Sequence, residues 1–266
     1  MVVGTIMVGA FVSKVLDVSP PLLWWPVLAT TVWIIYTIDH LMDGFKNVNN
    51  QTVIVRHNYH YRHKKVMLIL LFTLSTFTLW ASFTFMNTKI ILSGIVLFFL
   101  IILYFGLVHF FQNKSNHFFH KELFNALAYM AGILLAPAIW KDTPWSTFQI
   151  LILVGIVLLV WAEGVMASWF DFDNDLHDGH KSFATAFTKV NTKYFLVALH
   201  ILIFILLKIS IFYTTNWLQF SAILIEAVMN TGLLLIIMFP KKMIINDRYR
   251  ILGEMIFWLP GIIWLV

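Results

Sequence analysis

The residues most able to do chemistry are two pairs of aspartates, each at the end of a long apolar run. Asp39 and Asp43 close one run, and Asp171 and Asp175 follow another farther along the chain. Each pair has a spacing of four residues, so its members lie on one face of a helix. Such stacked carboxylates repel one another, and the repulsion is costly at a membrane boundary, where hydration is poor. Both pairs therefore predict a positively charged partner.

A divalent cation is the natural counter-charge for such pairs. Mg²⁺ prefers hard oxygen ligands and often bridges one or two carboxylates to a substrate phosphate. Two facing pairs would hold two Mg²⁺ ions with a diphosphate between them, and the metals would neutralise the leaving group as a carbon–oxygen bond breaks. The simpler alternative is that the pairs are solvated helix ends. The repeated arrangement favours the functional interpretation, because carboxylates at membrane depth usually serve a function.

The elements that must position these acids are transmembrane helices. The chain has 266 residues, of which 60% are hydrophobic and 12% are charged, against about 25% charged in soluble domains. A membrane-spanning helix needs ~20 apolar residues, and runs this long are helical because lipid leaves no backbone group unpaired. The sequence predicts one all-α domain over 1–266, a multi-span transmembrane bundle of about nine helices. The predicted runs are 1–16, 21–42, 66–86, 88–110, 122–140, 147–170, 193–213, 217–239 and 250–266.

The basic residues are distributed unequally between the two sides of this predicted bundle. With nine spans, 14 of the 18 lysine and arginine residues lie on the side of the acidic pairs. Cytoplasmic loops are enriched in such residues, so the acidic pairs are predicted to face the cytoplasm, in the inner membrane of a bacterium. The formal charge of +5 then reflects membrane topology and excludes nucleic acid as the expected partner. The sequence has no cysteine, which excludes disulfides, thiolate metal sites and a cysteine nucleophile.

Helix number, sidedness and acidic spacing together resemble the UbiA-type intramembrane prenyltransferase superfamily. Members of that family are nine-helix bundles with an NDxxDxxxD motif after the second helix and a DxxxD motif after the sixth. Asp39 and Asp43 match the last two acids of the first motif, and Asp171 and Asp175 match the second. Gly179 matches a glycine that often follows the second motif. The resemblance covers nearly the whole chain.

The sequence departs from the family pattern at several of these positions. The asparagine and first aspartate of the longer motif would fall at Ile35 and Tyr36. Many members carry an acid three residues before the second motif, where this chain has Ser168. The arginine-proline pair common after the first motif is absent, and the loop has Arg56-His57 instead. Each predicted metal site has therefore lost a ligand, which is typical of a divergent branch.

The resemblance implies a Mg²⁺-dependent transfer of a prenyl group from a polyprenyl diphosphate to an aromatic or lipid acceptor. The four aspartates would bind the metals and carry the catalysis. Arg56 and Lys121 match basic positions of the family and would hold the diphosphate, as would Lys181, while Tyr104 in the fourth run would face the cavity. Each of these residues also has an alternative interpretation. Arg56 would be one of the basic residues that cytoplasmic loops generally carry, and Lys121 would extend its charge from a helix end to the membrane surface. The Tyr104 hydroxyl would bond to a neighbouring helix.

Two other functions are compatible with the same features. A UbiA-like terpene cyclase would share the fold, the metals and the first chemical step. A transporter or a non-catalytic lipid-binding protein would use intramembrane acids as ion or proton paths, but the aspartate pairs lie at helix ends and not near the midplane. Glu163 lies inside the sixth run, and Glu226 and Asn230 lie one turn apart in the eighth. These three would orient an acceptor or pair with a buried base.

Overall fold

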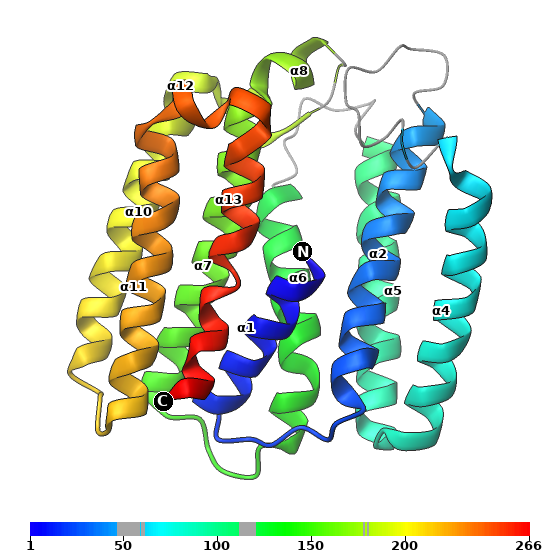
Figure 1. Ribbon diagram of the computed structural model, residues 1–266, viewed down its shortest axis with the longest axis vertical. Helices are drawn as coiled ribbons and strands as arrows, with labels where there is room; N and C mark the ends of the chain where they lie inside the picture. The colour runs from blue at the N-terminus through cyan, green and yellow to red at the C-terminus, as the bar shows by residue number, and fades with distance from the viewer. Residues whose placement is uncertain (47–58, 60–61, 112–120, 178, 180) are drawn as a thin grey trace.

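The computed structural model is a bundle of helices that lie side by side (Figure 1). It describes residues 1–46, 59, 62–111, 121–177, 179 and 181–266. Over these residues the secondary structure is helical and contains no strand, which confirms the all-α prediction.

The helices follow the predicted apolar runs, with short helices added between them at one end of the bundle. Their bounds are α1 (Val2–Val15), α2 (Trp24–Lys46), α4 (Lys64–Phe85), α5 (Thr88–Phe111), α6 (Lys121–Trp140), α7 (Thr147–Phe170), α8 (Phe172–His177), α9 (Phe183–Phe187), α10 (Lys189–Ile211), α11 (Trp217–Met238), α12 (Pro240–Met243), η1 (Ile245–Asp247), α13 (Arg248–Ile256) and η2 (Leu259–Leu265).

Five helices among the described residues are long and apolar enough to cross a membrane. They are α4, α6, α7, α10 and α11, and shorter apolar helices cover Val2–Val15 and Thr88–Tyr104. An integral membrane protein is therefore compatible with the structure, as predicted. The total of about nine spans stays a prediction.

The last predicted run, 250–266, differs from a single continuous helix. α13 ends at Ile256 and the 3₁₀ helix η2 begins at Leu259, with Pro260 in its first turn. Proline has no backbone N–H and its ring clashes with the preceding turn, so the α-helical hydrogen bonds stop here. The broken segment packs against α1 and α11, and this contact compensates for the interruption.

The start of α7 is fixed by a capping box. Gln149 N donates to Ser146 Oγ at 3.2 Å, and Ser146 N donates to Gln149 Oε1 at 3.0 Å. This exchange satisfies backbone groups that have no partner within the helix. Gln149 Nε2 also donates to Val15 O at 2.9 Å, which ties the start of α7 to the end of α1.

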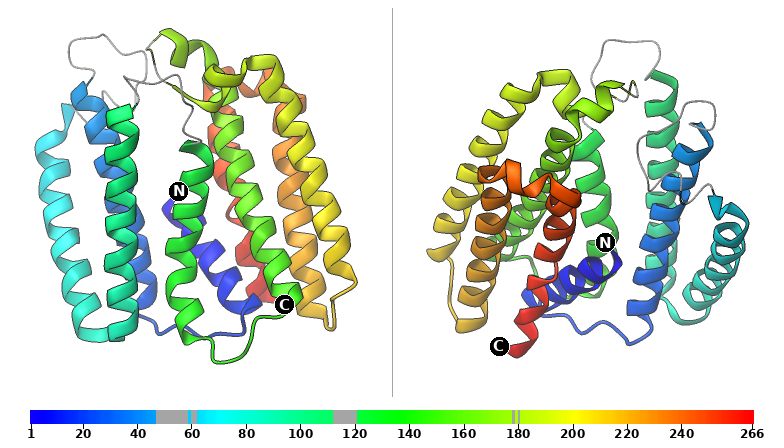
Figure 2. Two further views of the ribbon diagram at one scale, coloured as in Figure 1. Left: turned by 180° about the vertical axis from the view of Figure 1, so that it is seen from behind. Right: turned by 45° about the horizontal axis from the view of Figure 1, so that its top comes forward.

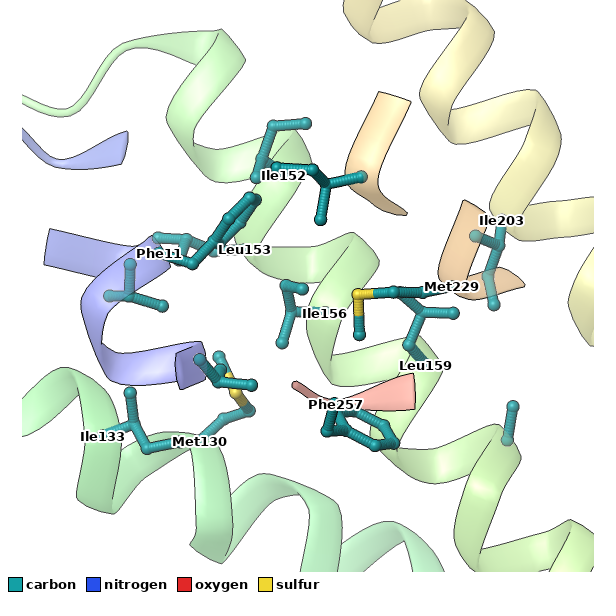
Figure 3. Packing of buried hydrophobic residues seen from close by; sticks show 14 of the residues in the cluster. Phe11, Met130, Ile133, Ile152, Leu153, Ile156, Leu159, Ile203, Met229 and Phe257 are labelled. Carbon is teal, nitrogen blue, oxygen red and sulfur yellow. The ribbon is translucent and has the colours of Figure 1, made fainter. Parts of the chain in front are cut away.

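α7 forms the centre of the hydrophobic core. It packs against α6, α10 and α11, and its Ile152, Ile156 and Leu159 are fully buried. Figure 3 shows Phe11, Met130 and Met229 of the neighbouring helices around these side chains. By contrast, α4 and α5 expose many large apolar side chains. Such faces suit a lipid environment, where apolar surface needs no cover.

The two acidic segments lie at the same end of the bundle, at the top of Figure 1. α2 and α7 both run toward this end, where α8 and α12 also lie, and the views of Figure 2 agree. Parallel directions follow from the alternation of helices along the chain. The structure thereby places the two elements that carry the predicted aspartates with their ends at the same end of the bundle.

Candidate functional site

Asp171 is a largely enclosed carboxylate among the predicted site residues at this end. It ends α7, and its side chain is 15% exposed. The Tyr249 hydroxyl donates to Asp171 Oδ1 at 2.6 Å, and the Arg250 guanidinium forms an ion pair with Asp171 Oδ2. Charge-assisted bonds of this kind are short and strong. Asp171 is therefore compensated by groups of its own chain.

Tyr249 and Arg250 are site residues that the sequence analysis missed. In the sequence, Arg250 is one of the 14 basic residues on the side of the acidic pairs and belongs to no motif. The partners stand 78 and 79 residues from Asp171, so no spacing in the sequence connects them. Their position depends on the turn before α13, where Asn246 and Asp247 adopt left-handed backbone angles with φ of 53° and 52°.

Arg250 is held on two sides and remains able to bind more. Its Nε donates to the Tyr249 hydroxyl at 2.9 Å, while Nη2 contacts Asp171. The Tyr249 ring stacks on Phe170, with centroids 4.3 Å apart, and burial raises the pKa of its hydroxyl. A guanidinium has five N–H donors, and two of them are used in these contacts. The remaining donors are oriented by the network and suit a phosphate oxygen.

Asp175 lies one turn beyond Asp171, in the short helix α8. It is buried, and its backbone N donates to Asp171 O at 2.8 Å, so the predicted common face continues across the end of α7. Asp173 points away from this face. Its exposed carboxylate pairs with Lys189 Nζ at 2.8 Å, as expected from its place in the sequence.

The start of α6 meets the segment that follows the second acidic pair. Glu122 is buried, and its Oε1 accepts a hydrogen bond from Phe183 N at 2.9 Å. Its Oε2 has no hydrogen-bond partner within the described part of the chain. Lys121 is adjacent and half-buried, which places the predicted cation beside this contact. Lys181 is exposed and directly precedes Ser182, the capping residue of α9.

Tyr104 contacts α6 through its ring; the predicted bond of its hydroxyl to a neighbouring helix stays a prediction. Its ring stacks on Phe124 with centroids 3.3 Å apart and an interplanar angle of 11°. Phe124 lies three residues after Lys121, so Tyr104 is near the acidic end and not at mid-bundle. Its predicted role in a substrate cavity stays a prediction.

The first acidic pair has a more open environment. The Asp39 side chain is 48% exposed, and His40 Nδ1 lies 3.9 Å from Asp39 Oδ2. The Tyr36 ring, at the position of the missing family acid, lies against His40 in a tilted arrangement, with centroids 3.9 Å apart and an interplanar angle of 35°. The side chain of Asp43 and the whole of Arg56 lie outside the described residues.

A cleft of about 200 Å³ lies beside α2, one turn below Asp39. Thr37 lines it, and the buried Thr37 hydroxyl has no hydrogen-bond partner among the described residues. The cleft separates α2 and α4 from the start of α1 and from α13. Its other lining residues are Met1, Val2, Trp33, Tyr36, Met67 and Glu254.

The predicted magnesium site stays a prediction, because the side chain of Asp43 lies outside the described residues. Among the described residues, no group of three or more histidine, aspartate or glutamate side chains lies close enough to share an ion. Asp171 has both oxygens bound to Tyr249 and Arg250, so a metal ion would have to share or replace these contacts. The arrangement instead places a guanidinium where the resemblance puts a metal.

Comparisons with known proteins add no relative. No protein-family model, no curated protein and no solved structure matches this chain.

Proposed function

We propose that this protein is an intramembrane transferase that moves a prenyl group from a polyprenyl diphosphate to an aromatic or lipid acceptor. The observation that carries the proposal is the contact of Asp171 with Arg250 and Tyr249. This contact lies at the end of the bundle where α2, the helix that contains Asp39, also ends. The resemblance of the two acidic motifs to UbiA-type prenyltransferases supports the same substrate class.

The diphosphate would be held by cations of this chain. Arg250 would use the N–H groups that its contacts with Asp171 and Tyr249 leave over. Lys121 and Lys181 would take further charge from α6 and from the segment before α9. Neutralising the phosphate oxygens stabilises the negative charge that develops on the leaving group.

The helices would bind the prenyl tail and exclude water. The carbon–oxygen bond of an allylic diphosphate breaks to leave an allylic cation and free diphosphate, and the acceptor carbon then forms the new bond and loses a proton. Such a cation survives only where water is excluded. Apolar helices open to lipid supply this environment, and the membrane supplies the hydrophobic acceptor.

Magnesium dependence is part of the proposal. When bound, Mg²⁺ would supply further positive charge to the diphosphate. Asp39, Asp43, Asp171 and Asp175 are the residues proposed to bind it. Because Asp171 is paired with Arg250, a bound ion would share this carboxylate with the guanidinium or replace that contact.

Binding of a labelled allylic prenyl diphosphate to the purified protein tests this function. We expect binding that weakens at least tenfold with a chelator and in Asp171→Asn. Asp173→Asn is the matched control, because Asp173 is an exposed acid of the same segment that pairs with Lys189. No binding at any prenyl chain length would contradict the proposal, as would equal loss in both variants.

We also propose that the acidic end faces the cytoplasm of a bacterium, as the distribution of basic residues favours. The chain has no cysteine, so single cysteines report sidedness without background. Lys241→Cys lies at the acidic end, and Asp142→Cys lies in the loop between α6 and α7 at the other end. In intact cells a membrane-impermeant thiol reagent should label Asp142→Cys only. Labelling of Lys241→Cys only would reverse the orientation.

A further inference from the structure

One carboxyl group is enclosed in the middle of the bundle, away from the acidic end. Glu226 lies near the midpoint of α11 and is 0% exposed. Neither of its carboxyl oxygens has a hydrogen-bond partner among the residues that the structure describes. Buried polar groups are nearly always paired, so this carboxyl needs a physical explanation.

The neighbouring helix is shaped around this carboxyl. Gly155 of α7 faces Glu226, and a Cβ atom placed on Gly155 would overlap Glu226 Oε2. Leu206 Cδ2 of α10 would lie 3.5 Å from this Cβ atom. Glycine is less favourable than alanine inside a helix. A glycine at this contact leaves room for the carboxyl group. This favours a site that accommodates Glu226 and not a burial by chance.

A histidine lies one helical turn away in the same interface. His200 Nδ1 lies 2.7 Å from Asn230 Oδ1, and Asn230 Nδ2 donates to His200 O at 3.1 Å. Because the amide nitrogen donates to the carbonyl, Oδ1 must be the acceptor, and Nδ1 therefore carries the hydrogen. His200 Nε2 is then a bare acceptor, and it has no partner in the described part of the chain.

The two groups are complementary in chemistry. An isolated carboxylate in an apolar interior is so costly that the group binds a proton instead. Protonated Glu226 has one O–H donor, and His200 Nε2 is an acceptor. Glu226 and Asn230 stand four residues apart on α11, which separates the two sites by about 6 Å along the axis.

The described groups on the neighbouring helices offer Glu226 no counter-charge. The titratable groups on the helices packed against α11 include Glu163 of α7, His200 and Lys208 of α10, Lys14 of α1, and Arg250 and Glu254 of α13. None of them forms an ion pair or a hydrogen bond with Glu226. Lys14 and Lys208 lie in the last turns of their helices, at the end of the bundle opposite Arg250.

We propose that Glu226 and His200 form a proton-binding site in the interior of the bundle, between α7, α10 and α11. Glu226 holds the proton, and His200 Nε2 of α10 is an unpartnered acceptor in the same interface, at the level of Asn230. Release of the proton leaves a carboxylate facing Gly155 without a partner, which weakens the packing of α11 on α7. This site does not depend on the proposed prenyl transfer, which takes place at the end of the bundle.

Infrared spectroscopy of the full chain in lipid nanodiscs tests proton binding directly. A protonated carboxyl gives a carbonyl band that shifts in D₂O. We expect this band near neutral pH in the wild type and its loss in Glu226→Gln. Glu163→Gln, which removes another acid within an apolar helix, is the matched control and should keep the Glu226 band. An identical spectrum for wild type and Glu226→Gln would overturn the proposal.

Two further measurements keep the test decisive. If Glu226→Gln does not fold, Glu226→Asp retains an acid with a shorter side chain, and the band should shift in frequency. The apparent unfolding temperature should fall with rising pH more steeply for the wild type than for the folded variant, because ionisation leaves a charge unpaired. Equal pH dependence would overturn the coupling to packing. All these readouts are made without prenyl diphosphate, so their failure is distinct from failure of the transferase proposal.

Discussion

The two acidic segments have the same spacing and lie at the same end of the bundle, but their environments differ. Asp171 is enclosed and bound by Tyr249 and Arg250, whereas Asp39 is half exposed, with His40 at 3.9 Å. The difference arises because different helices lie beside the two segments. α13 returns to the end of α7, whereas α2 ends at the edge of the bundle near α4. The spacing of two acids thus predicts a shared face and leaves the electrostatic environment undetermined.

The largest expected effect on stability comes from removing the enclosed acid. Asp171→Ala leaves the Arg250 guanidinium without its carboxylate, and breaking an ion pair of limited exposure costs about 3 kcal/mol. Asp39→Ala should cost less than about 1 kcal/mol, because its carboxylate is half exposed. Denaturant titration in mixed micelles measures both free energies of unfolding. Equal losses would remove the distinction between the two segments.

A double-mutant cycle should show that the ion pair of Asp171 and Arg250 stabilises the second acidic segment. We expect a coupling energy of about 2 kcal/mol between Asp171 and Arg250, because the two groups contact each other directly. The corresponding cycle for Asp39 and His40 should give less than about 0.5 kcal/mol at neutral pH. Additive effects of Asp171→Ala and Arg250→Ala would show that the contact contributes little.

Tyr249→Phe should have an intermediate effect. The substitution keeps the stacking on Phe170 and removes the hydroxyl that donates to Asp171 Oδ1 and accepts from Arg250. Loss of a hydrogen bond to a charged group costs about 1.5 kcal/mol. The same unfolding titration gives this value, and a loss equal to that of Asp171→Ala would assign the effect to packing of the ring instead.

We expect the smallest loss of stability from a substitution outside the helix face that Asp171 and Asp175 share. Asp173→Ala removes an exposed pair with Lys189, and such pairs contribute at most about 0.5 kcal/mol in most cases. Its free energy of unfolding and its prenyl diphosphate binding should match the wild type. A large loss in either would mean that all the acids of this segment act together, not Asp171 and Asp175 alone.

The sequence predicted the helices well because hydropathy reports membrane spans directly. The apolar runs, the common end of α2 and α7, and the outward direction of Asp173 all follow from periodicity and alternation. Pro260 is a helix breaker, whereas hydropathy alone predicts one uninterrupted run over 250–266. Hydropathy averages over a window and does not register a single break.

The pairing of side chains could not be predicted in this way. Faces toward lipid and faces toward protein are equally apolar, so the pattern does not tell which helices meet. The contact of Arg250 with Asp171 depends on a left-handed turn at Asn246 and Asp247. The site at Gly155 likewise depends on which face of α7 meets Glu226. Both are products of tertiary packing, not of local spacing.

Release of diphosphate from an allylic prenyl diphosphate, measured in nanodiscs with lipid extract as the acceptor source, tests most directly whether the two acidic segments act on one substrate. Asp39→Asn and Asp171→Asn should each lower the rate at least 100-fold in folded protein, and Asp173→Asn should leave it unchanged. A rate close to the wild type in either of the first two variants would contradict the proposed site.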